Sequence, residues 1–254
     1  MAERSRTIKV LAVLQVHNEE AYLPGCLDHL RPFVDGFVIL DDGSTDRTRD
    51  ILTREPKLLA LLENPPARPH RWNERENRRR LLTEALGLGA DWVLCCDADE
   101  RYEIAFLRRM RGISAAFPGN GRVFVSLFFR ELWNSPLRFR VDGVWGAKRM
   151  IRFFSLPQEI SYDLSRPLHS EWYPDGVRLE GNGLLDSACL YHLKSILRTD
   201  RISRRDFYKK LDPDRHYQKM GYDYLAEEGP EMQLQTIPPG RGYDLASLPS
   251  FLQF

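Results

Sequence analysis

Acidic residues follow two apolar segments in the first half of the chain. Asp41 and Asp42 come directly after the apolar run 36–40, and Asp97 and Asp99 come directly after a second such run. Runs of this kind are typical of strands covered on both faces, and the carboxyl ends of parallel strands are where α/β sheets bind ligands. A carboxylate there can hold a divalent cation together with phosphate oxygens. The four residues therefore predict a site for a phosphate-bearing ligand and its metal ion.

The elements that must position these carboxylates are predicted as alternating strands and helices. Asn18 is expected to cap the first helix, which Pro32 ends. Strands are expected at 8–16, 36–40, 57–62 and 91–96, and the later helices at 44–54, 73–86 and 102–111. This alternation indicates a doubly wound, mostly parallel sheet.

The pattern changes after Gly112. Apolar, β-rich runs at 122–130, 149–154 and 183–190 predict further strands, and 201–228 predicts one or two helices. The tail from Gln233 shows no clear hydrophobic periodicity, and one interpretation is that it becomes ordered only when a partner binds.

Composition limits the function classes. Lys and Arg number 37 against 36 Asp and Glu, which argues against a nucleic-acid partner. The basic residues of 198–210 are expected to form a solvated helix face. The four cysteines show neither zinc spacing nor a disulfide framework, which favours reduced thiols and a cytoplasmic protein. No apolar stretch approaches the length of a membrane span, and no signal core is evident at the N-terminus.

Three motifs in this order resemble the family 2 glycosyltransferases of the GT-A fold. They are QVHNEE at 15–20, FVILDDGSTDRT at 37–48, which is the most specific, and WVLCCDADE at 92–100. The resemblance implies an α/β fold with a Rossmann-like, mostly parallel central sheet flanked by helices, a β-rich acceptor half and C-terminal helices. It divides a single GT-A domain into a nucleotide-sugar-binding half at 1–112, an acceptor-binding and catalytic half at 113–230, and an irregular tail at 231–254.

The resemblance also implies roles for individual residues. Asp41 or Asp42 would accept a hydrogen bond from the base; a uracil imide N–H suits a carboxylate, so the expected donor is a UDP-sugar. Asp97 would meet the ribose and Asp99 the metal ion, Mn²⁺ or Mg²⁺. The remaining nucleotide-binding candidates are Gln15, Asn18, Asn77 and Arg78.

The second half should supply the catalytic base and another metal ligand. Glu171 lies in a segment resembling the His-x-Glu segment of some family members, and is the expected base; a structural ion pair is the alternative. His192 resembles a late histidine that completes the metal shell, although a structural hydrogen-bonded histidine explains it equally well. His169 is a weaker candidate ligand, and Asp142 and Asp186 are the reserve candidates for the base.

The sequence thus predicts an inverting, metal-dependent glycosyltransferase that acts on an unidentified acceptor: a small molecule, a glycan or a protein. A peripheral membrane contact through the basic helix or the tail stays open. One alternative is a nucleotidyltransferase, against which the absence of glycine from 15–20 counts. Another is a nucleotide-binding module that has lost its catalytic activity.

Overall fold

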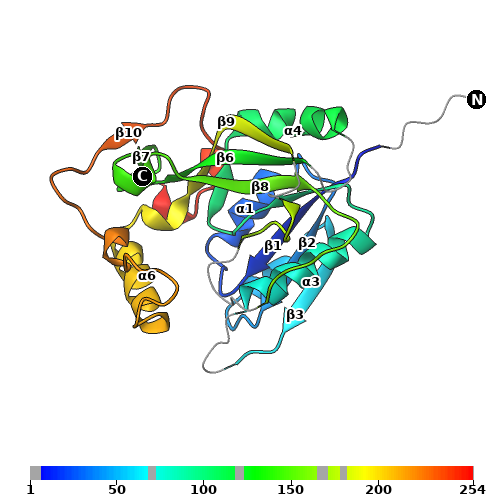
Figure 1. Ribbon diagram of the computed structural model, residues 1–254, viewed down its shortest axis with the longest axis horizontal. Coiled ribbons are helices and arrows are strands. Elements are labelled where there is room, and N and C mark those ends of the chain that lie inside the picture. The colour runs from blue at the N-terminus through cyan, green and yellow to red at the C-terminus, as the bar shows by residue number, and fades with distance from the viewer. Residues whose placement is uncertain (1–6, 68–72, 118–122, 165–170, 178–181, 254) are drawn as a thin grey trace, which may run out of the picture.

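A central sheet of eight strands organises the molecule, in the order β3-β2-β1-β4-β8-β6-β9-β5 (Figure 1). The computed structural model describes residues 7–67, 73–117, 123–164, 171–177 and 182–253. The strands of this sheet are β1 (Val10–Val16), β2 (Gly36–Asp42), β3 (Leu58–Asn64), β4 (Trp92–Cys95), β5 (Glu100–Tyr102), β6 (Val123–Glu131), β8 (Arg149–Ser155) and β9 (Asn182–His192).

Most of these strands run in the same direction. β1 pairs in parallel with β2 and β4, β2 with β3, and β6 with β9. β8 is antiparallel to both β4 and β6, and β5 is antiparallel to β9. The predicted mostly parallel sheet with a β-rich second half is therefore confirmed, although the short strand β5 was not foreseen.

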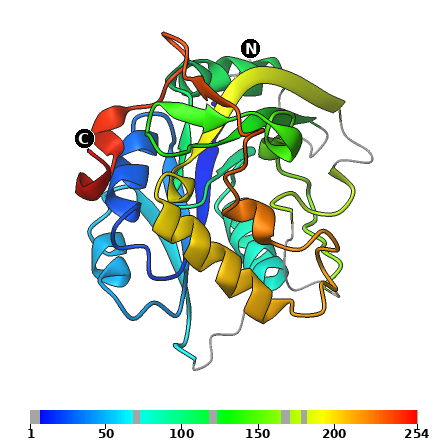
Figure 2. The ribbon, with the colours of Figure 1, turned by 90° about the vertical axis from the view of Figure 1, so that its left-hand side faces the viewer.

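Helices cover both faces of the sheet because β1 is apolar on both of its sides. Val10, Ala12 and Leu14 belong to one core, which includes helices α1 (Leu23–Leu30) and α4 (Ile104–Ala116), whereas Leu11 and Val13 belong to the other core, beneath α3 (Glu74–Gly87). Figures 1 and 2 show α1 and α3 on opposite faces. The short helix α2 (Thr48–Leu52) follows β2.

The C-terminal part wraps around this core. Helix α6 (Arg198–Leu211) stands beside the carboxyl ends of the strands, and β10 (Leu234–Thr236) pairs with β7 (Arg138–Arg140) in a second, small sheet (Figure 2). The 3₁₀ helices are η1 (Gly143–Trp145), η2 (Leu193–Ser195), η3 (Asp223–Leu225), η4 (Leu245–Ser247) and η5 (Ser250–Leu252).

The tail packs on the domain itself. Leu252 is fully buried in the same core as α1, and the buried guanidinium of Arg101 donates to the carbonyl oxygen of Ser247 at 2.9 Å. Its ordering therefore needs no partner, contrary to the interpretation drawn from its irregular sequence. In the ranges that the structure describes, we find no helix whose length and apolar character would let it cross a bilayer.

Asn18 does not cap α1. The helix begins five residues later, at Leu23, and its N-cap Tyr22 makes no side-chain capping bond. Asn18 instead has a positive φ of 54°, and its Oδ1 accepts a hydrogen bond from the backbone N–H of Thr45 at 2.8 Å. The first motif is thereby hydrogen-bonded to the second, and the loops after β1 and β2 are joined to each other.

Candidate active site

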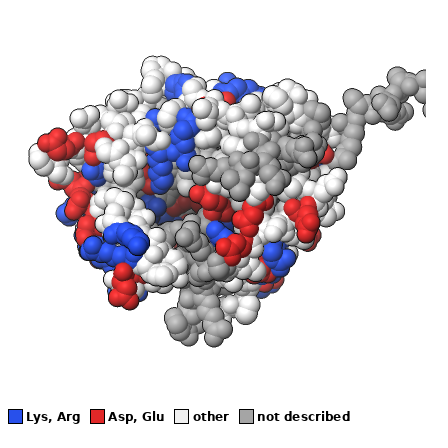
Figure 3. All heavy atoms as spheres, in the orientation of Figure 1, with Lys and Arg blue, Asp and Glu red and all other residues white. Residues whose placement is uncertain are grey.

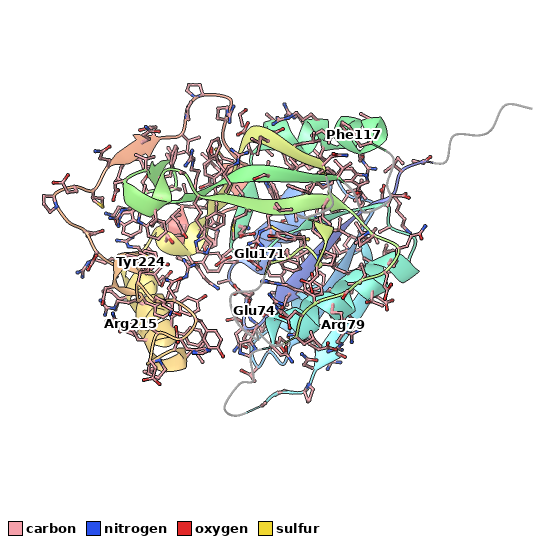
Figure 4. All side chains as sticks on the ribbon, in the orientation of Figure 1. Glu74, Arg79, Phe117, Glu171, Arg215 and Tyr224 are labelled. Carbon is pink, nitrogen blue, oxygen red and sulfur yellow. The ribbon has the colours of Figure 1, made fainter. Side chains whose placement is uncertain are left out.

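Two adjoining cavities, A and B, lie among the carboxyl ends of β1 and β4, the end of β9, and helices α3 and α6. Each has a volume of about 260 Å³, and six residues line both: Glu74, Arg78, Asp97, His192, Arg204 and Tyr208. Figure 3 shows acidic and basic side chains next to one another near the centre of this face. In Figure 4, Tyr224 approaches cavity B from the side of α6 and Glu74 from the side of α3.

The acidic triplet forms a tight turn between β4 and β5. A carboxylate oxygen of Asp97 accepts from Arg152 Nη2 at 3.0 Å, and the same nitrogen donates to Glu100 at 2.7 Å. Burial raises the pKa of Glu100 to about 7 despite the charge of Arg152. Behind the turn, Arg101 Nη1 donates to the carbonyl oxygens of Ala98 and Glu100, both at 2.8 Å. The turn is therefore fixed on both sides, and its two aspartates face the cavities.

Asp99 and His192 meet on the wall of cavity A. His192 Nε2 lies 3.0 Å from Asp99 Oδ2, and Lys194 Nζ lies 3.6 Å from the same oxygen. Burial alone would raise the pKa of Asp99, but the charges of His192 and Lys194 hold it well below its ordinary value. Burial likewise opposes the charge of His192, yet Glu131 and Asp99 raise the pKa of this imidazole to about 9.

This pair fits a divalent cation whose other ligands come from a substrate. Among the residues that the structure describes, no group of three His, Cys, Asp or Glu side chains could hold a metal ion by itself. Mg²⁺ sites characteristically use one or two carboxylates and complete the octahedron with phosphate oxygens and water. Two adjacent ligands of an octahedron with bonds of about 2.1 Å lie about 3 Å apart, close to the observed separation of Asp99 Oδ2 and His192 Nε2.

Cavity B is lined by the predicted base. Glu171 is exposed and lies on this cavity. The next residue, Trp172, is fully buried and lies beneath the guanidinium of Arg78 at 4.7 Å, so it supports the wall. The reserve candidates lie elsewhere: Asp142 is paired with Arg140 and Asp186 with Arg109, and neither lines cavity A or cavity B. His169 lies outside the described residues.

Six of the predicted site residues converge on the two cavities: Gln15, Arg78, Asp97, Asp99, Glu171 and His192. Four do not line them: Asn18, Asp41, Asp42 and Asn77.

Strand β2 extends through Asp41 and Asp42, so both are buried, at 4% and 3% exposure. Asp41 accepts from the N–H of Ser44, whereas Asp42 accepts from Gln15 Nε2 at 3.2 Å. Asn77 is 2% exposed. Gln15 lines cavity A, and Asp42 lies behind it, so the side chain of Gln15 separates Asp42 from the cavity.

Sequence reasoning missed several cations at the site. Lys194 and Arg204 line cavity A, and Lys148, Arg152 and Arg204 line cavity B. Arg204 belongs to the basic segment expected to be a solvated helix face, and Arg201 of the same segment is only 1% exposed. That prediction is wrong for these two residues. Their spacing of three, which places them on one face of α6, was the available signal.

The amino-terminal part of the chain matches a known protein family. Residues 12–115 match the family model described as glycosyl transferase family 2, which confirms the family predicted from the three motifs. The matched residues run from β1 to α4 and include the acidic triplet of the site.

The chain is also similar to individual proteins, over part of their length. The chain is 27% identical over 225 residues to the uncharacterized proteins Rv3786c of Mycobacterium tuberculosis and Mb3815c of Mycobacterium bovis, a match covering 82% of this chain and 51% of each relative. The chain thus spans about half the length of these curated relatives. Among solved structures, it is similar to glucosyl-3-phosphoglycerate synthase from M. tuberculosis in complex with Mn²⁺, UDP and glucosyl-3-phosphoglycerate: 26% identity, 48% of this chain, 44% of that chain and a TM-score of 0.38.

Proposed function

We propose that this protein is an inverting, metal-dependent glycosyltransferase that moves a sugar from a nucleoside-diphosphate sugar to an acceptor hydroxyl. The observation that carries the proposal is the meeting of Asp99 and His192, 3.0 Å apart, on the wall of a cavity at the carboxyl ends of β1 and β4. A carboxylate and an imidazole at this edge of the sheet suit a diphosphate and its cation.

Cavity A is the proposed donor side. Gln15 would lie beside the base, and Asp42 would act on the base through Gln15, which it holds, or directly after a side-chain rearrangement; a uracil imide N–H suits such a carboxylate. Asp97 would meet the ribose. Lys194 and Arg204 add positive charge where the diphosphate would lie, since both line this cavity. Asn18, Asp41 and Asn77 would act by holding the loops around the nucleotide.

Cavity B is the proposed acceptor side. In an inverting transfer, the acceptor oxygen attacks the anomeric carbon while its proton passes to a base, and the bond to the diphosphate breaks. We assign the base to Glu171 because it is exposed and lines cavity B. Arg78 and Asp97 line both cavities, so an acceptor in cavity B would lie next to a donor in cavity A.

Mn²⁺ or Mg²⁺ bound by Asp99 and His192 would supply Lewis-acid stabilisation of the leaving diphosphate. The imidazole ligand favours Mn²⁺, because Mg²⁺ prefers an all-oxygen shell. Lys194 and Arg204 would balance the remaining negative charge as the sugar–phosphate bond breaks.

The experiment that tests the proposal combines thermal stability with donor turnover. UDP is expected to stabilise the protein only when Mn²⁺ is present, by about 2.7 kcal/mol at a UDP concentration of 100 times its Kd. In Asp99→Asn this metal-dependent stabilisation and the hydrolysis of UDP-sugars should both be lost. Asp186→Asn is the matched control, since Asp186 lines neither cavity.

Three results would count against the proposal. If UDP stabilises the protein equally with and without Mn²⁺, nucleotide binding does not depend on a metal ion. Full turnover in Asp99→Asn would show that Asp99 is not a metal ligand needed for the reaction. The same screen with GDP and dTDP assigns the nucleotide, and a protein that responds to none of the three would be a binding module for another ligand.

The setting of the reaction is also part of the proposal. All four cysteines are buried and unpaired, which agrees with a reducing, cytoplasmic environment. There the acceptor would be a small molecule, a glycan or a protein, reached with or without a peripheral membrane contact.

A further inference from the structure

A buried carboxylate, Glu131, lies directly behind the proposed metal ligand. It ends β6, and the parallel register of β6 and β9 places it opposite His192. The antiparallel register of β5 and β9 places Glu100 against His192 on the other side. Glu131 is 1% exposed and lines neither cavity, so it has no direct access to a substrate.

One oxygen of Glu131 is bonded to the histidine. Oε2 lies 2.5 Å from His192 Nδ1 and also accepts a short hydrogen bond from the hydroxyl of Ser195. A carboxylate can only accept at this position, so Nδ1 must carry a proton. By the same reasoning Nε2 donates to Asp99 Oδ2 at 3.0 Å, and a cation held by these two atoms would replace that proton, so Nε2 is the metal-binding atom.

The ring of His192 is also fixed in orientation. Phe129, two residues before Glu131 on the same strand, packs against the imidazole with ring centroids 5.6 Å apart and planes inclined by 34°. Rotation of His192 would break the Glu131 contact and the Asp99 contact together. β6 therefore holds the imidazole from behind and from one face.

We propose that Glu131 is a positioning residue for the metal site: it fixes the tautomer and orientation of His192, so that Nε2 and Asp99 face the same cation. This inference rests on the proposed function, because it presumes that His192 binds metal. A carboxylate that accepts the second N–H of a metal-bound histidine also makes that histidine a stronger ligand.

A purely structural role is the competing explanation. The other oxygen of Glu131, Oε1, lies 3.7 Å from Lys148 Nζ and 3.5 Å from Arg204 Nη1. Within the described part of the chain, Oε1 accepts no hydrogen bond. Lys148 and Arg204 therefore contact Glu131 only at ion-pair distances, whereas its two hydrogen bonds are to His192 and Ser195. This asymmetry favours positioning of the histidine over bridging of Lys148 to α6.

The test measures Mn²⁺ binding directly, by loss of the free-ion electron paramagnetic resonance signal, in the wild type and in Glu131→Gln. UDP is present in every sample, because the other metal ligands are expected from the diphosphate, and a protein-free sample with UDP supplies the baseline. We expect Mn²⁺ binding to weaken by roughly 10- to 100-fold in the variant. Glu103→Gln is the matched control: Glu103 is also 1% exposed, but it pairs with Arg241 away from both cavities. Its Mn²⁺ affinity should stay within twofold of the wild type, whatever its stability.

A second measurement needs no variant. With Mg²⁺ and UDP bound, the ¹⁵N side-chain spectrum of the wild type should show His192 protonated at Nδ1 and unprotonated at Nε2. A proton on Nε2 in that complex would overturn the proposal. So would Glu131→Gln that binds Mn²⁺ as tightly as the wild type.

Failure of the underlying function looks different. If the wild type binds no Mn²⁺ in the presence of UDP, or if Asp99→Asn binds it unchanged, the metal site itself is wrong. If the wild type binds Mn²⁺, Asp99→Asn loses it and only Glu131→Gln is unaffected, the proposed function stands and the role of Glu131 does not.

Discussion

Arg101 makes the sharpest test of how the acidic turn is held in place. Its side chain is fully buried, and its guanidinium makes five hydrogen bonds, to the carbonyl oxygens of Ala98, Glu100, Tyr22 and Ser247 and to the Ser247 hydroxyl. It therefore connects the turn that carries Asp97 and Asp99 to the segment before α1 and to the tail. The perturbation we choose is Arg101→Met, which keeps an unbranched side chain but removes every donor.

The expected cost follows from those bonds. Four buried carbonyl oxygens lose a partner, at about 1 kcal/mol each, and relief from burying the guanidinium charge offsets part of this. We expect the free energy of unfolding to fall by about 3 kcal/mol. Since two of the carbonyls belong to the turn itself, Mn²⁺ binding should weaken as well.

Urea unfolding followed by circular dichroism measures this loss, with Arg109→Met as the control. The Arg109 side chain is 40% exposed and pairs with Asp186, so its removal should cost less than about 1 kcal/mol. A loss in Arg101→Met no larger than in Arg109→Met would refute the reasoning, because the buried carbonyls would then have found other partners at no cost.

Three further predictions concern other parts of the chain. Burial lowers the pKa of His29 from 6.5 to about 4, so the folded state disfavours the protonated imidazole. The contribution of His29 to the free energy of unfolding is therefore fully present above pH 6.5 and is lost as the pH falls towards 4. Urea titrations across that range should show a loss of about 3 kcal/mol in the wild type that is absent from His29→Gln. A Cβ on Gly25 would lie 1.9 Å from the carbonyl oxygen of Ser247, so Gly25→Ala should lower the Tm although alanine favours helix, and a raised Tm would mean that the tail detaches freely. Glu171→Gln should slow sugar transfer by on the order of 100-fold and leave UDP binding unchanged, measured by UDP release and calorimetry; equal losses in both would indicate a structural role.

Much of the amino-terminal half was predictable from local sequence. Apolar runs long enough for strands, separated by helical segments, allowed a mostly parallel sheet to be predicted, because a strand covered on both faces must be apolar on both. The three motifs at 15–20, 37–48 and 92–100 then gave the resemblance to the family 2 glycosyltransferases, since their residue types and order can be read without coordinates. The match over residues 12–115 ends where these local signals end.

The tertiary structure decided which polar residues face a cavity. Asp41 and Asp42 follow the same pattern as Asp97 and Asp99, but β2 continues through the first pair and buries it against β3, whereas β4 ends at Cys95 and leaves the second pair on the wall of cavity A. Strand length is set by hydrogen bonding to a neighbour distant in sequence, so the motif alone could not distinguish the two cases.

Glu131 illustrates the same limit on the other side of the site. It stands 61 residues from His192, and nothing in its local sequence marks it. Only the register of β6 with β9 brings its carboxylate to the imidazole. The sequence by itself determined the types of residues available for chemistry and the family that their motifs resemble. Their partners, burial and charge states depend on pairings between strands that are far apart along the chain.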